Sequence, residues 1–280
     1  MRTISTFVLF ASLLLVLFVA GCSDDDSPTG TSASSPSIMV FSAIYLEAGR
    51  LVGYMESWDV TSSGKHIDSI HIGPDLKIDD LESWYWAGDD QYWSANLWNY
   101  FDSGYTSGDT VTVRLFDAGN MAEVNIKILD RQYDSVVMIT VPSGPIALNS
   151  TPQFVWRSFD DADFYTVSAD HYYEDSSGHS MSVRKSWATT DTTITLPSTL
   201  TAHDGDLNFN VMPYRGPRPT GEGVVPANVS TATMRGQIWT YGRGQYRNFS
   251  VGAGFSLVNE VGSTLQMQPE DILRDLTNIR

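Results

Sequence analysis

Residues 167–187 have the sequence VSADHYYEDSSGHSMSVRKSW, and Ser176-Ser177-Gly178 has the composition of a three-residue hairpin loop. With Gly178 at the positive-φ position, the flanking runs pair so that one face is mainly apolar and the other polar. A two-residue loop would shift the register by one and mix the faces. The polar face then opposes Asp170 to Arg184, and the apolar face opposes Tyr173 to Met181, His171 to Val183, Ala169 to Lys185 and Val167 to Trp187. Lys185 is the one charged residue on the apolar face, and we expect it at the rim of the sheet.

Short alternating runs continue on both sides of this hairpin. In 110–116 and 123–129 apolar residues alternate with polar ones, and Asp117-Ala118-Gly119-Asn120 between them is a plausible hairpin connection. Such alternation is typical of antiparallel sheets with one dry face, and the turn spacing favours sandwiches. Two prolines in Val141-Pro142-Ser143-Gly144-Pro145 interrupt a strand ladder and predict a domain boundary.

The second half of the chain resembles a fibronectin type III domain over 142–235. The resemblance is carried by Pro152-Gln153-Phe154-Val155-Trp156, Asp163 to Val167, Leu200, Gly205 to Val211, Thr220 to Gly223 and Val229 to Thr233, the last two standing for the loop and the final strand. Leu207 stands where that family usually has a tyrosine. The resemblance implies a fold and no activity.

These patterns together predict an all-β protein with two tandem antiparallel β-sandwiches, immunoglobulin-like and then fibronectin type III-like. The expected organisation is a signal peptide at 1–21, an acidic and Ser-rich flexible linker at 22–37, sandwiches at 38–141 and 142–235, and a C-terminal extension at 236–280. Within the extension, 269–276 has helix-start residues and an apolar stripe, which predict a short helix that docks on a sandwich or binds a partner.

The N-terminus resembles the lipobox signal peptide of bacterial lipoproteins. Arg2 precedes an apolar run at 7–20 that is short for a membrane span, and the run ends in Val19-Ala20-Gly21-Cys22. The resemblance implies cleavage before Cys22 and acylation of its thiol. Ser23 in place of an aspartate favours the outer membrane, and the following acidic run leaves both the periplasmic face and the cell surface open. An ordinary signal peptide with an incidental cysteine is the alternative.

Composition excludes several classes of function. The chain of 280 residues has 17 Lys+Arg against 33 Asp+Glu, a net charge of −16, which makes a nucleic-acid partner a poor expectation. Its single cysteine excludes a disulfide framework and a cysteine-based zinc site. Residues 207–250 are the exception to the acidity, with five arginines and one acid. We expect this segment to lie against an acidic surface of its own chain or of a partner.

Candidate catalytic or metal-binding groups each have a structural interpretation. Glu174 falls on the opposite face of the predicted hairpin from His171 and His179, so the three do not converge on a metal. The acidic stretches 160–163 and 204–206 lack a full calcium ligand set and are interpreted as turns. Enzyme motifs are absent, so the sequence predicts no catalytic residue, no metal and no cofactor.

Aromatic residues are concentrated between 84 and 101. A sandwich strand has one core face, so one aromatic set there should lie outside the core, where it stacks on sugars or on a protein. Burial against the second domain or the C-terminal segment is the alternative. The candidate ligand-binding residues are Trp84, Trp86, Tyr92, Trp98 and Tyr100.

The predicted function is therefore a non-enzymatic binding or structural module, held to the membrane through acylated Cys22, with a protein or an envelope glycan as ligand. Two alternatives stay open. One is a carbohydrate-binding protein that uses the aromatic residues above, and the other is a glycan-active hydrolase with paired carboxylates.

Overall fold

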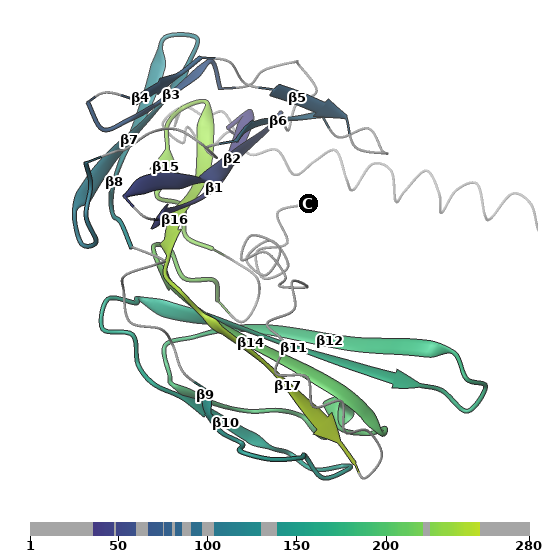
Figure 1. Ribbon diagram of the computed structural model, residues 1–280. Coiled ribbons are helices and arrows are strands. Elements are labelled where there is room, and N and C mark those ends of the chain that lie inside the picture. The colour runs from purple at the N-terminus through teal and green to yellow at the C-terminus, as the bar shows by residue number, and fades with distance from the viewer. Residues whose placement is uncertain are drawn as a thin grey trace, which may run out of the picture. The chain divides into compact units, whose positions relative to one another are not determined.

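The computed structural model describes residues 36–47, 49–59, 67–74, 76–79, 82–85, 91–96, 104–129, 139–220 and 225–252 (Figure 1). Every element in these ranges is a β-strand except one 3-10 turn, η1 (Ser198–Leu200), so the all-β prediction is confirmed. The predicted signal peptide, most of the linker and the C-terminal helix lie outside the described residues. Among the described residues, no helix has the length and apolar character needed to span a bilayer.

The described strands form three sheets. In chain order the strands are β1 (Ile38–Glu47), β2 (Arg50–Asp59), β3 (Ser69–Ile72), β4 (Leu76–Ile78), β5 (Glu82–Tyr85), β6 (Gln91–Asn96), β7 (Thr110–Asp117), β8 (Asn120–Lys127), β9 (Ile139–Val141), β10 (Gln153–Trp156), β11 (Phe164–Glu174), β12 (Ser180–Thr189), β13 (Thr193–Thr195), β14 (Gly205–Arg215), β15 (Val229–Ser230), β16 (Met234–Tyr241) and β17 (Gln245–Val251). A ten-stranded sheet runs β12-β11-β14-β16-β1-β2-β6-β5, with β15 beside β16 and β17 beside β14. The smaller sheets run β13-β10-β9 and β4-β3-β7-β8.

The first core lies between the sheet β4-β3-β7-β8 and one face of β1, β2 and β16. Alternate residues of β7 are fully buried there with Ile38 and Val40 of β1 and Met55 of β2. The hairpin predicted between β7 and β8 is confirmed, with Asp117 opposite Asn120 and the two loop residues Ala118 and Gly119 at φ values of 41° and 91°. Two positive φ values match the right-handed twist of the flanking strands.

The second core lies between the sheet β13-β10-β9 and the strands β12, β11, β14 and β17. Phe154 of β10 stacks on Phe209 of β14 with ring centroids 3.9 Å apart, and Trp156, Leu200 and Leu207 are buried in the same cluster. Leu207 is fully buried at the position where the family resemblance would place a tyrosine.

The hairpin register predicted for 167–187 is confirmed for every pair. Val167 opposes Trp187, Ala169 opposes Lys185, and Asp170 opposes Arg184. Gly178 has a φ of 78°, and the Asp175 amide donates to the His179 carbonyl at 2.9 Å, which closes the three-residue loop. Lys185 is exposed, as expected.

One strand expected from the family resemblance is wrong. The segment 229–233 was to be the last strand of the second sandwich, but only Val229–Ser230 is a strand, and it pairs with β16. The strand beside β14 is β17, which opposes Phe249 to Leu207. Alternation identifies a strand but not the sheet edge that it joins. The expected limit of the second sandwich at residue 235 falls inside β16.

Strand β16 joins the two sandwiches. It lies parallel to β1 of the first sandwich and antiparallel to the end of β14 of the second, where Tyr214 opposes Tyr241 and Arg215 opposes Thr240. Figure 1 shows β16 beside β1, with β17 continuing from it into the second sandwich. The chain thus leaves the second sandwich after β14, adds a strand to the first, and returns as β17.

Large aromatic side chains pack where these strands meet. The Phe41 and Trp239 ring centroids are 4.9 Å apart, and those of Tyr45 and Tyr241 are 4.5 Å apart. The Trp239 indole N–H donates to the Pro217 carbonyl at 2.6 Å. We call this cluster the aromatic seam; its buried members are Phe41, Ala43, Tyr45, Val52, Phe164, Met212, Tyr214, Val225, Trp239 and Tyr241.

The charge of the exposed Lys185 is expected to keep the edge strand β12 from pairing with strands of other chains. β12 ends the described path of the large sheet, and Val183 and Trp187, on either side of Lys185 along its face, pack against the second core. A charge on the inward face of an edge strand opposes edge-to-edge association. We expect Lys185→Val to raise self-association, measured by light scattering after size exclusion over a range of concentrations. Lys185→Arg keeps the charge and should behave as wild type; a Val variant that also does so would contradict this role.

Candidate functional site

Two of the predicted aromatic ligand-binding residues lie in register with a third aromatic residue. Trp84 of β5 opposes Tyr92 of β6, and Tyr92 opposes Trp58 of β2. The three residues therefore form one row across adjacent strands of the large sheet. Trp58 was missed because it is far away in the sequence. Trp86, Trp98, Tyr100 and the lipidation residue Cys22 lie outside the described residues and stay predictions.

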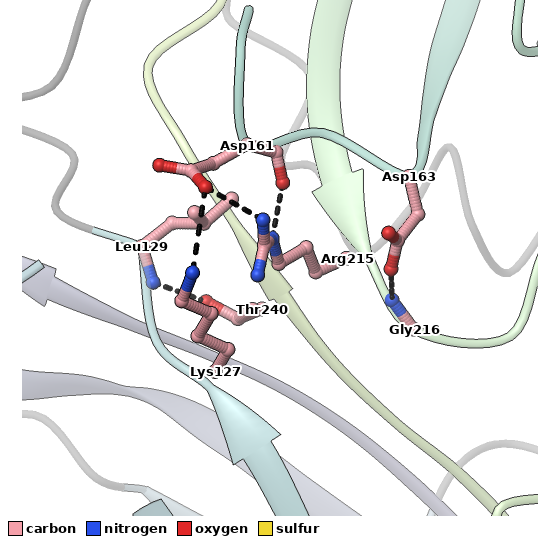
Figure 2. A network of polar contacts seen from close by, with 7 residues as sticks. All are labelled: Lys127, Leu129, Asp161, Asp163, Arg215, Gly216 and Thr240. Carbon is pink, nitrogen blue, oxygen red and sulfur yellow. Dashed lines mark hydrogen bonds and ion pairs between the residues drawn. The ribbon is translucent and has the colours of Figure 1, made fainter. Parts of the chain in front are cut away.

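The acidic loop 160–163 contacts the arginine-rich segment (Figure 2). Asp161 Oδ1 accepts a hydrogen bond from Arg215 Nη2 at 2.6 Å and lies 3.7 Å from Lys127 Nζ. The Arg215 Nε also donates to the Asp161 carbonyl, and Asp163 Oδ2 accepts from the Gly216 amide at 3.0 Å. For Arg215, the expected docking of the basic segment on an acidic part of its own chain is confirmed. These carboxylates hold a loop of the second sandwich against β8 and β14.

A buried hydrogen bond anchors the chain where it leaves the first sandwich. The Leu129 amide donates to Thr240 Oγ1 at 3.0 Å, as Figure 2 also shows, and the Leu129 carbonyl accepts from the Leu46 amide at 2.9 Å. Leu129 is fully buried, so leaving its amide without this partner would destabilise the folded state. The polar contacts of the junction are therefore structural.

The histidines of the β11–β12 hairpin are not brought together. His171 is fully buried and lies 5.3 Å from the Tyr173 ring, which stacks on His203 with centroids 4.1 Å apart. The His179 side chain is 76% exposed and lies 3.6 Å from Asp175. Glu174 opposes Ser180 on the other face. Within the described ranges, no group of three His, Cys, Asp or Glu side chains converges to hold a metal ion.

Polar and phenolic residues gather on the outer face of the second sandwich. Asp170 opposes Arg184 on one side and Asn208 on the other, Asn208 opposes Asn248, and the neighbouring rows bring in Tyr172 and Tyr246. We call Asp170, Tyr172, Arg184, Asn208, Tyr246 and Asn248 the Tyr172 face. Tyr172 is 48% exposed near the hairpin end of β11, and Arg184 Nε lies 3.6 Å from Asp170 Oδ1.

The electrostatics of the Tyr172 face keep its phenols protonated. Burial, and then the Asp170 carboxylate, raises the pKa of Tyr172, while Arg184 lowers it. Burial, Tyr172, Asp170 and Asp206 raise the pKa of Tyr246. Both phenols are therefore hydrogen-bond donors near neutral pH. The hairpin pattern predicts the pairing of Asp170 with Arg184, but the amides of β14 and β17 lie beside them only because of the strand order, which the sequence pattern does not show.

Buried His171 predicts a pH dependence of stability. Burial, and then His203, lowers the pKa of His171 below the ordinary value of 6.5, although the His203 backbone and Asp206 oppose the shift. The unfolded chain therefore binds a proton at His171 more readily than the folded chain does. The contribution of neutral His171 to the free energy of unfolding is fully present above pH 6.5 and is lost as the pH falls through the folded-state pKa. Urea unfolding between pH 8 and pH 5 should show a steeper loss for wild type than for His171→Leu. His179→Leu controls for the loss of an exposed imidazole, and parallel profiles for wild type and His171→Leu would contradict the assignment.

Comparison with known proteins gives distant structural similarity only. No family model and no curated protein matches the chain. Among solved structures, SGBP-B of the Bacteroides ovatus mixed-linkage glucan utilization locus, in complex with a mixed-linkage heptasaccharide, is 15% identical with a TM-score of 0.20; the match covers 71% of this chain and 43% of that one. The FN1–FN3 domains of chicken CNTN1 are 10% identical with a TM-score of 0.30, covering 79% and 66%. A chimeric titin Z1Z2 is 7% identical with a TM-score of 0.20, covering 75% and 94%.

The chain thus spans less than half the length of the glucan-locus protein. At such TM-scores the description of the fold rests on the strand pairings given above.

Proposed function

We propose that this chain is a lipid-anchored, non-enzymatic binding or structural module of the cell envelope. The observation that carries the proposal is the Tyr172 face, where an exposed phenol stands among amides, a carboxylate and a guanidinium on a sheet. Such a surface offers a ligand hydrogen-bonding groups beside one exposed aromatic ring. The acids at 161 and 163 serve the junction, and the hairpin histidines are apart, which supports binding over catalysis. A glycan-active hydrolase gains no support from these groups.

The proposed anchor is the acylated thiol of Cys22, followed by a linker rich in Ser, Thr, Gly and Asp before β1 begins at Ile38. Ser23 favours the outer membrane, with the periplasmic face and the cell surface both compatible.

A carbohydrate-binding role for the first sandwich is the second candidate. It is favoured by the row Trp58, Tyr92 and Trp84, because residues directly opposite each other on adjacent strands have Cβ atoms about 5 Å apart. Three aromatic residues in such a row suit a platform on which successive sugar rings stack.

The anchor is tested by labelling with palmitate in a bacterium that processes lipoproteins. Wild type should incorporate the label and sediment with membranes, whereas Cys22→Ala should remain unlabelled and keep its leader, as seen by mass spectrometry of the intact protein. Ser23→Ala, one residue away, should still be labelled. Maturation of Cys22→Ala like wild type would show that the N-terminus is not a lipoprotein signal.

A further inference from the structure

The Tyr172 face is held in place by the strands on both sides of β11. Four strands, β12, β11, β14 and β17, place its residues in adjoining rows, and the opposite face of the same strands carries the second core. The positions of these side chains are therefore set by strands rather than by a loop. A face built in this way keeps its geometry when a ligand arrives.

The charges of this face disfavour an anionic ligand. Its one cation, Arg184, lies against Asp170, and Asp206 opposes Tyr172 in the next strand. Burial is the main cause that raises the pKa of the phenols at Tyr172 and Tyr246, and Asp170 adds to it at both. With two carboxylates against one guanidinium, the local potential is negative. Phosphates, uronates and nucleic acids would meet this potential as a repulsion. The remaining polar groups are neutral amides and hydroxyls.

The groups of the face both donate and accept hydrogen bonds: the carboxylate of Asp170 accepts, the guanidinium of Arg184 donates, and the amides and phenols do both. Thr166 is fully buried, and its Oγ1 has no hydrogen-bond partner among the described residues. Ser186 Oγ and Asn208 Oδ1, in the next two rows of the same side, are also buried atoms with no hydrogen-bond partner among the described residues. Oxygen atoms left without partners cost free energy. These three atoms have less than 1 Å² of accessible surface, so the hydroxyls of a ligand would pair instead with the amides, phenols and carboxylate of the Tyr172 face.

Only a few ligand classes combine hydroxyl donors with a face that stacks on a phenol. A sugar ring has both, because its axial C–H groups form an apolar patch and its edge is lined with hydroxyls. A protein partner would require an apolar centre beside Tyr172, whereas the neighbours of Tyr172 in register are Ser182 and Asp206.

We propose that the Tyr172 face binds a neutral glycan, with a sugar ring stacked on Tyr172 and its hydroxyls hydrogen-bonded to Asp170, Arg184 and Asn208. This inference rests on the proposed function as a binding module and names its ligand class. It places the glycan on the second sandwich, away from the aromatic row of the first.

The test is affinity electrophoresis of the full chain, solubilised in mild detergent, in native gels that contain β-glucan, xylan, galactomannan or dextran. Polygalacturonate serves as the anionic counterpart. At least one neutral polymer should retard wild type. Tyr172→Ala should weaken that affinity roughly tenfold, because the stacking surface is lost, and Tyr172→Phe should keep most of it. Met181→Ala, which removes a side chain 44% exposed on the opposite face of the neighbouring strand, is the matched control and should bind as wild type.

Three results would overturn the proposal: no retardation by any neutral polymer, retardation by polygalacturonate alone, or equal retardation of wild type and Tyr172→Ala. The last would place a glycan elsewhere, with the Trp58 row as the next position to test. Tyr172→Phe reports on binding even where the alanine variant fails to fold. Palmitate labelling of Cys22 that persists without glycan binding refutes this inference and leaves the proposed anchor intact. Glycan binding by a protein that is not labelled would support this inference and refute the proposed anchor.

Discussion

The pairing of β14 with β16 is the contact on which the rest of the structure depends. At this point Tyr214 opposes Tyr241 and Arg215 opposes Thr240, and the two sandwiches become parts of one hydrogen-bonded sheet. The aromatic seam covers the junction on one face, and the ion pairs of Asp161 with Arg215 and Lys127 add to it from the loop after β10. Burial of large aromatic side chains contributes more than these partly exposed ion pairs, which are worth about 1 kcal/mol or less each.

A shared sheet has a consequence for binding. Strand register places the Tyr172 face of the second sandwich on the same side of the large sheet as Phe41 and Tyr45 of the seam. Two flexibly linked domains would present two independent surfaces, whereas a continuous sheet fixes the register between them. Any ligand of this surface would then meet a preorganised protein, which reduces the entropy lost on binding.

The sequence pattern predicts the hairpins of this fold, whose paired strands are neighbours in the chain. The loop Ser176-Ser177-Gly178 and the Ala118-Gly119 turn follow from turn chemistry, and the register of each hairpin follows from keeping apolar residues on one face. The docking of Arg215 on acidic residues followed from the uneven charge. The strand at 229–233 was misplaced, because the partner of β16 is β1, and nothing in either sequence stretch marks a parallel pair. The Tyr172 face was missed for the same reason, since Asn208 and Asn248 reach Asp170 only through strand order.

Whether the junction makes one body of the two sandwiches can be measured by differential scanning calorimetry of the full chain. A shared sheet predicts a single transition, with the calorimetric enthalpy equal to the van't Hoff enthalpy. Two resolved transitions, or a calorimetric enthalpy near twice the van't Hoff value, would show that the sandwiches unfold independently and would contradict the account.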